Sequence, residues 1–250
     1  MAVFVVADPV GQHEAVLSLQ LSASPASLES PAAPSSILSR LRLESRAEHE
    51  AVEKVLDLMS ASLTRESYSQ KLQQFYGFYA PLEKALQNRS DRKAGGVDAP
   101  LSVATRAALA ARLTKTDCLR QDLRHFGVTA EELPLCHDLP PLGNQADVLG
   151  CLYVLEGATL GGRMITLHVQ STLGITPIAG GTFFEGYGAR TGTMWQTMRH
   201  LLVSAALDTP TENAMVASAI ATFSCLRLWC ESGMIPSATS AAAQPTTRHA

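Results

Sequence analysis

The amino-acid sequence predicts an all-α protein. Apolar residues recur at spacings of three and four along most of the chain, which is the period of a helix. No segment shows the convincing alternation of apolar and polar residues that is typical of strands. Hydrophobic residues make up 46% of the 250 residues, which is enough for one sizeable core. We therefore expect a single helical domain over residues 37–235, with about seven helices and no internal repeat.

Two flanking segments differ from this domain in composition. Residues 1–36 contain three acidic residues and no lysine or arginine, and from Ser22 onward they are rich in serine, alanine and proline. They lack the basic start of a secretory signal and the arginines of a mitochondrial transit peptide. Residues 236–250 have a similar polar, small-residue composition. We expect both segments to be disordered extensions, and we expect the protein to be cytoplasmic.

The first half of the domain is expected to hold four helices. One runs from Ile37 to about Ser60 and is capped by Ser35 or Ser36. The second begins after Thr64 and carries one apolar stripe, formed by Tyr68, Leu72, Phe75, Tyr79 and Leu82. Residues 88–100 are polar and contain two adjacent glycines, which indicates a loop. Two further helices are expected over residues 101–113 and 117–126.

The second half is expected to contain one long helix and two helices after it. Residues 130–142 are rich in proline and are predicted to be mostly loop. The long helix should run from Gln145 to Leu173 and stop at Gly174. Residues 175–189 are rich in glycine and should be irregular. Helices are then expected over 191–207 and from 209 to about 231, where residues 209–212 form a capping box with Pro210 at the first helical position.

The long helix is interrupted by Gly157, Gly161 and Gly162. Each glycine inside a helix costs about 1 kcal/mol relative to alanine, so the three together cost roughly 3 kcal/mol. A helix with this cost is usually kinked, or something lies very close to its backbone. Two interpretations therefore stand side by side: close packing or a kink, for which Gly162 is the best candidate, or a helix that lies flat against a planar group.

A second candidate segment lies in the first helix. Arg42, Arg46, His49 and Glu53 are spaced three or four residues apart, so they share one side of a helix. Neutral imidazole is a good ligand for iron, and its second nitrogen usually needs a partner, which Glu53 could supply. The two arginines could bind carboxylates of a ligand. The alternative interpretation is a solvated face of ion pairs with an incidental histidine.

Charge and motif content argue against several other classes of protein. A net charge of −3 indicates neither a nucleic-acid partner nor an anionic membrane surface. The longest apolar stretch, residues 150–168, contains Glu156 and Arg163 and is therefore not a predicted membrane span. Five cysteines without a CxxC pair indicate unpaired thiols in a reducing compartment. The sequence has no HxxxH or ExxH pair, P-loop, GxGxxG or GxSxG motif.

Together, the two candidate segments resemble the heme oxygenase family, in particular its bacterial biliverdin-producing branch. The resemblance begins with the spaced residues Leu41, Ser45, His49 and Glu53. It continues with residues 153–162, which read Tyr-Val-Leu-Glu-Gly-Ala-Thr-Leu-Gly-Gly, and ends with residues 183–188 and 191–195. It spans about residues 37–235. One departure lies at Ala158, where the animal enzymes carry an aspartate that organises water and the bacterial branch commonly does not.

The resemblance implies a multi-helical bundle in which heme is sandwiched between two helices. His49 would be the axial ligand of the iron, with Glu53 beside it. Gly157 and Gly161 would be the catalytic positions, since they let the second helix pass close over heme and O2. Arg42 and Arg46 match basic positions near the heme propionates, and Arg199 is a looser match to such a position.

The implied reaction is the cleavage of heme to biliverdin, dependent on O2 and electrons, with release of CO and iron. Heme is then both substrate and cofactor, and electrons come from an external donor, a ferredoxin or a reductase, because the chain has no flavin or nicotinamide motif. Two alternatives stay open. One is a non-catalytic heme-binding protein of the same fold. The other is a related helical enzyme of the thiamine-degrading or quinone-cofactor oxidase type, which would need acidic and cysteine or multi-histidine sites.

Overall fold

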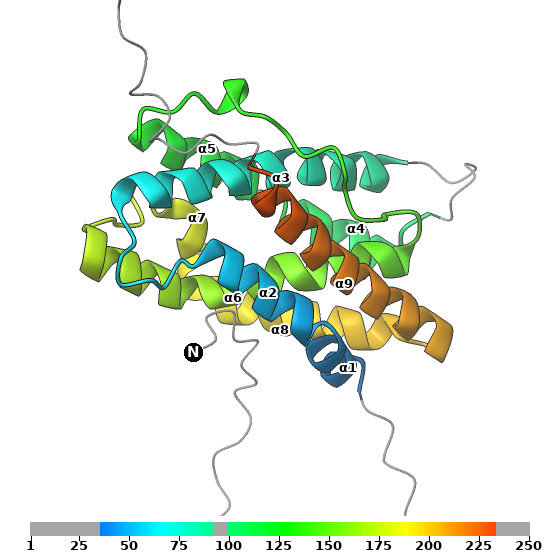
Figure 1. Cartoon of the computed structure of the whole chain (residues 1–250). Helices are drawn as coiled ribbons and strands as arrows, with labels where there is room; N and C mark the ends of the chain where they lie inside the picture. Colours follow the sequence, from blue (N-terminus) through cyan, green and yellow to red (C-terminus); the bar gives the residue numbers. More distant parts are fainter. Residues whose placement is uncertain (1–35, 93–99, 234–250) are drawn as a thin grey trace, which may run out of the picture.

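The computed structural model describes residues 36–92 and 100–233. Within these ranges the protein has nine α-helices, two short 3-10 helices and no β-strand, so the predicted all-α class is confirmed (Figure 1). The α-helices are α1 (Ile37–Glu44), α2 (Arg46–Leu56), α3 (Arg65–Asp91), α4 (Val103–Ala110), α5 (Lys115–His125), α6 (Gln145–Leu173), α7 (Thr182–Glu185), α8 (Thr191–Ala205) and α9 (Thr209–Glu231). The 3-10 helices are η1 (Ala130–Glu132) and η2 (Gly188–Arg190). The expected disorder of 1–36 and 236–250 lies outside the described residues, except for Ser36, which caps α1.

The structure has two helices where the sequence predicted one from Ile37 to about Ser60. α1 and α2 meet at Ser45, whose Oγ donates a hydrogen bond of 2.6 Å to the carbonyl oxygen of Leu41. A serine hydroxyl bonded four residues back tends to bend a helix. α2 ends at Leu56, because Asp57 adopts a left-handed conformation with φ 45°. The single charged face predicted from the spacing is therefore divided between two helices.

Most other helices have the predicted positions, with two differences. α6 begins after its cap at Asn144 and ends at Gly174, which has φ 66°, as expected for a glycine cap. α3 continues to Asp91, into the segment predicted as a loop. The cap of α9 is Asp208, whose side chain accepts a hydrogen bond of 2.8 Å from the backbone N–H of Thr211. An aspartate satisfies this exposed N–H at least as well as the threonine that follows it.

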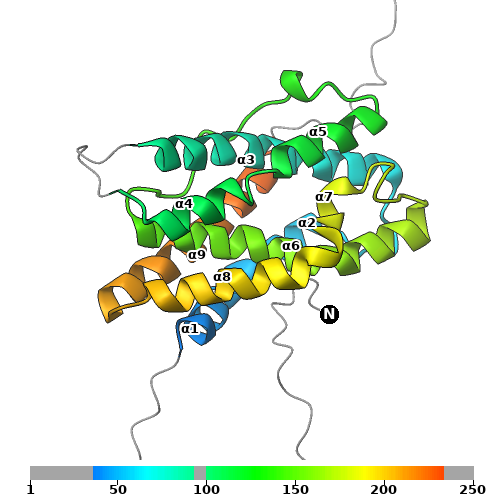
Figure 2. The ribbon, with the colours of Figure 1, turned by 180° about the vertical axis from the view of Figure 1, so that it is seen from behind.

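α6 lies at the centre of the bundle. It packs most extensively on α9 and also contacts α7 and α8. Figure 1 shows α3 and α5 along one edge and α1 at the opposite edge, with α6 between them. The view from behind shows α8 running beside α6 (Figure 2). The apolar stripe predicted on α3 faces this centre, since each of its five residues is at most 2% exposed.

Two of the described helices, α6 and α9, are long and apolar enough to cross a membrane by length and composition alone. The apolar window of α6 is 78% buried inside the protein, and that of α9 is 50% buried. The core helix of a globular protein meets the same criteria of length and composition. The burial of α6 therefore explains its hydropathy without a membrane.

Two glycines of α6 allow close packing against neighbouring helices. A Cβ atom at Gly150 would overlap the backbone carbonyl of Met215 in α9, and one at Gly162 would overlap the carbonyl of Phe184 in α7. α6 nevertheless runs as one continuous helix. Gly162 thus serves packing, whereas the sequence suggested a kink.

Replacing Gly150 with alanine is expected to destabilise the fold by about 1–3 kcal/mol, because the added methyl group forces α6 and α9 apart. The free energy of unfolding in urea measures this effect. Gly192 in α8 is the matched control, because a Cβ atom there would have nothing within 4 Å. The alanine variant at Gly192 should be as stable as the wild type or slightly more stable. Equal stability of the two variants would contradict the proposed close contact at Gly150.

Candidate functional site

His49 lies on α2 with its side chain 16% exposed. Its Nε2 is 3.7 Å from Oε1 of Glu53, which is too long for a hydrogen bond but close enough for electrostatic attraction. The ring of Phe223 in α9 lies 5.2 Å from the imidazole, centroid to centroid. Burial lowers the pKa of His49, and the charges of Glu53 and Glu50 only partly oppose this effect. The imidazole is therefore neutral at pH 7, which is the form that binds metals.

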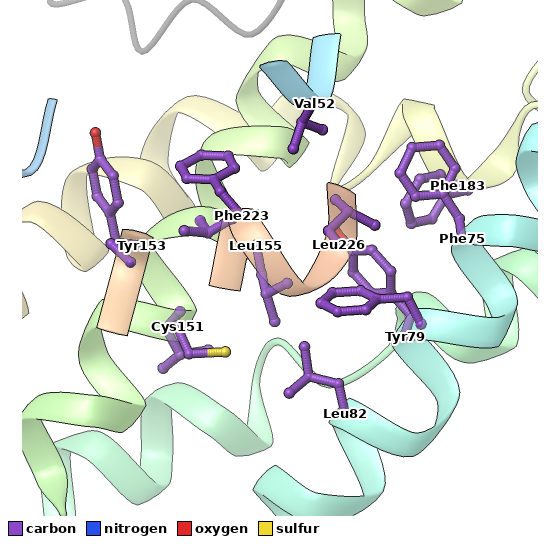
Figure 3. Close-up of a cluster of buried hydrophobic side chains, with 14 of the residues drawn as sticks. Val52, Phe75, Tyr79, Leu82, Cys151, Tyr153, Leu155, Phe183, Phe223 and Leu226 are labelled. Carbon is purple, nitrogen blue, oxygen red and sulfur yellow. The ribbon is translucent and has the colours of Figure 1, made fainter. Parts of the chain in front are cut away.

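Gly157 and Gly161 are buried one turn apart near the middle of α6. α2 and α6 each pack along α9, whereas direct contacts between α2 and α6 are few. The helix that carries His49 and the helix that carries Gly157 and Gly161 are therefore both anchored on α9, and they make few contacts with each other. Figure 3 shows side chains of α2, α6 and α9, among them Val52, Leu155 and Phe223, gathered in one apolar cluster.

The side of α6 that carries these glycines also carries exposed apolar residues. Leu160 and Met164 follow Gly157 at offsets of three and seven, so they lie on the same stripe of the helix. Leu160 is half-buried, and Met164 is 52% exposed. An apolar stripe that the rest of the protein covers only in part can serve as a binding face.

The structure separates the three candidate arginines. Arg46 is 70% exposed and forms an ion pair of 2.6 Å with Glu50. Arg42 is exposed on α1, and its charge acts on the hydroxyl of Tyr153 in α6, against the burial that raises the pKa of this tyrosine to about 12. Arg199 is half-buried on α8, which packs against α1. Arg42 and Arg199 thus lie on neighbouring helices, α1 and α8, and Arg46 lies on α2 in its ion pair with Glu50.

The sequence analysis missed a buried ion pair, which Glu156 of α6 forms with Arg112. Glu156 is 4% exposed, and its carboxylate accepts hydrogen bonds from Arg112 Nε at 3.1 Å and from the Tyr187 hydroxyl at 2.7 Å. Arg112 donates further hydrogen bonds to the carbonyls of Ala108 and Met194. The available signal was the carboxylate of Glu156 inside the apolar stretch 150–168, because a buried charge requires a partner.

Replacing Arg112 with methionine is expected to destabilise the protein by about 3–5 kcal/mol, because Glu156 would remain buried without its opposite charge. Denaturant unfolding at pH 7 measures the change. The double variant Arg112→Met, Glu156→Gln should recover part of the lost stability, since the uncompensated charge is then removed. A loss below about 1 kcal/mol in the single variant would contradict the importance of this pair.

Residues 35–232 match the family model described as heme oxygenase. The fold is similar to that of the heme oxygenase of Neisseria meningitidis, whose structure was solved with NO and CO bound. The TM-score is 0.60 at 18% sequence identity, and the match covers 80% of this chain and 92% of the Neisseria chain. No curated protein sequence matches the chain. At 18% identity, the similarity to the Neisseria structure supports the fold alone. The family model matches residues 35–232, which is most of the chain.

Proposed function

Because the chain belongs to the heme oxygenase family, as the sequence predicted, we propose that it binds heme between α2 and α6 and converts it to biliverdin, CO and iron. One observation carries the proposal. His49, half-buried and neutral, lies on α2, and α2 packs along α9 as does α6, the helix that carries Gly157 and Gly161. The five cysteines are unpaired thiols, which agrees with the reducing, cytoplasmic compartment that is part of the proposal.

The residues of this site fit heme in their chemistry. A neutral imidazole suits iron, and His49 would be the only protein ligand of the metal. Gly157 and Gly161 present backbone without side chains, so a flat ring could approach α6 closely. Leu160, Met164 and Phe223 supply the apolar surroundings that a porphyrin ring requires.

Each residue then has a distinct task. Bound heme would supply the iron chemistry that activates O2. Glu53 would orient the imidazole of His49 and keep it basic, as a carboxylate does for many ligating histidines. Gly157 and Gly161 would leave room beside the backbone of α6 for the flat ring and for O2.

The arginines would orient the ring rather than take part in the chemistry. Arg42 and Arg199 would bind the propionates through charge-assisted hydrogen bonds and so fix the rotation of the ring in its pocket. Arg46 would join them only after releasing Glu50. Electrons would come from an external ferredoxin or reductase.

The proposed function is tested by adding hemin to the protein and then a reductant in air. A Soret band should appear with hemin and should then bleach as the absorption of biliverdin grows. A Soret band that persists would contradict turnover and would favour a non-catalytic heme-binding protein of the same fold. The absence of any Soret band would contradict both functions.

A further inference from the structure

A buried lysine lies close to α6, on the side of Ala158 and Thr159. Lys115 opens α5, where its backbone N–H donates a hydrogen bond of 2.8 Å to Oε1 of Glu83. The residue is 4% exposed. Its Nζ lies 4.8 Å from the centroid of the Tyr187 ring and 5.8 Å from that of Phe183. Among the residues that the structure describes, this Nζ has no hydrogen-bond acceptor and no ion-pair partner.

Lys115 lines a small cavity that reaches α6. The cavity has a volume of about 10 Å³, with Lys115 in its wall together with Ala158 and Thr159 of α6. Aromatic side chains complete the wall: Phe75, Tyr79, Phe183 and Phe184. Gly186, with φ 63°, keeps the space open, because a Cβ atom there would lie 2.6 Å from Thr159 Cγ2 and 3.5 Å from Lys115 Nζ. A space of this size holds one water molecule.

The ammonium group of Lys115 requires more stabilisation than its visible contacts provide. Burying a charge without a hydrogen bond is unfavourable, and the two aromatic rings compensate only part of the loss of hydration. Burial lowers the pKa of Lys115, and attraction to Glu156, Cys118 and Glu83 opposes this. A water molecule in the cavity would supply the acceptor that Nζ lacks.

We propose that Lys115 holds one water molecule behind α6, and that through this water its positive charge acts on the side of α6 where Gly157 lies. The water oxygen would accept a hydrogen bond from Nζ, so its own hydrogens would point away from the lysine, into the part of the cavity that Ala158 and Thr159 of α6 line. Lys115 is then a positioning residue, which orders solvent and favours negative charge near α6. The effect of the charge, unlike the water site, rests on the proposed function, because heme and O2 would occupy the side of α6 where Gly157 lies.

The water site can be tested without heme. A crystal structure of the heme-free protein, at a resolution that shows ordered solvent, should contain a water within about 3 Å of Lys115 Nζ. The same water should be missing from Lys115→Met, whose unbranched side chain is one heavy atom shorter and has no donor. A dry cavity in the wild-type protein would overturn the inference, whether or not the protein binds heme.

The effect of the charge can be tested by ligand binding to the ferric heme complex. Azide, an anion, should bind about tenfold more weakly to Lys115→Met than to the wild type. Neutral imidazole should bind equally well to both, which separates a loss of charge from a general disturbance of the site. Arg163→Met is the matched control, because it removes one exposed positive charge from α6 and should change azide affinity less than twofold.

These outcomes distinguish the inference from the proposed function. Unchanged azide affinity in Lys115→Met would overturn the electrostatic role of Lys115 even if heme turnover is normal. Equal weakening of azide and imidazole would overturn it as well. A protein that forms no Soret band would refute the proposed function and the electrostatic role, while the heme-free crystal structure still decides the water site.

Discussion

Replacing His49 with alanine is expected to abolish heme turnover and to change the iron spectrum, while the helical fold stays intact. The loss should exceed the roughly 10- to 100-fold effect that is typical when only an outer-shell partner of a ligand is removed. The fold should survive, because His49 is partly exposed and alanine is a good helix former in α2. Heme spectra and turnover measure the first effect, and far-UV circular dichroism measures the second.

Two controls separate the loss of the iron ligand from other effects of the His49→Ala substitution. Glu53→Gln keeps the shape of the side chain and removes its charge, so it should reduce turnover about tenfold and leave the iron ligand in place. Free imidazole added to His49→Ala should restore part of the ligand-bound spectrum, because it can enter the space that the side chain leaves. Unchanged turnover in His49→Ala would refute the assignment of this histidine as the ligand.

Replacing Gly161 with leucine is expected to block the site by bulk. The leucine side chain would project from the stripe that Leu160 and Met164 share, where the ring or O2 would bind. Hemin affinity or turnover should therefore fall at least tenfold, although the helix propensity of α6 rises by about 1 kcal/mol. Hemin titration and the rate of biliverdin formation measure the two quantities.

The size of the new side chain should determine how much activity is lost. Gly161→Ala adds one methyl group and should retain more activity than Gly161→Leu. Thermal unfolding of both variants shows whether a loss of activity reflects blocking or unfolding. Normal activity in a folded Gly161→Leu variant would contradict the close approach of α6 to the ring.

Local signals predicted much of the fold. α6 was predicted from Gln145 to Leu173 because one long apolar segment ends at a glycine, Gly174. The break at Ser45 was not predicted, since it depends on which way a serine hydroxyl turns. Serine is compatible with a helix interior as well as with a bend, so its presence alone does not distinguish the two.

The candidate site was predictable only where its residues are near in sequence. His49 and Glu53 are one turn apart on one helix, so their proximity follows from the helical period. Arg112 and Glu156 are 44 residues apart, and only the packing of the helices brings them together. Lys115 had no sequence signal beyond its position near the start of a helix. Its burial depends on α3, α6 and α7, whose side chains line the same cavity.

The glycines of α6 also show that sequence alone does not distinguish residues whose contacts depend on the packing of the helices. In the sequence, all of them lower helix propensity by a similar amount. In the structure, Gly150 and Gly162 are explained by the carbonyl groups of α9 and α7 that lie against them. Gly157 and Gly161 share a stripe with exposed apolar residues, and heme is the proposed reason for them.

The central claim, that this chain opens heme, is tested most directly by measuring CO released per heme consumed when the reduced complex reacts with O2. The account predicts one CO for each heme lost, with biliverdin formed in equal amount. Bleaching of the Soret band without CO would contradict the account, because it would show that heme is destroyed by diffusing peroxide and not cleaved in the site between α2 and α6.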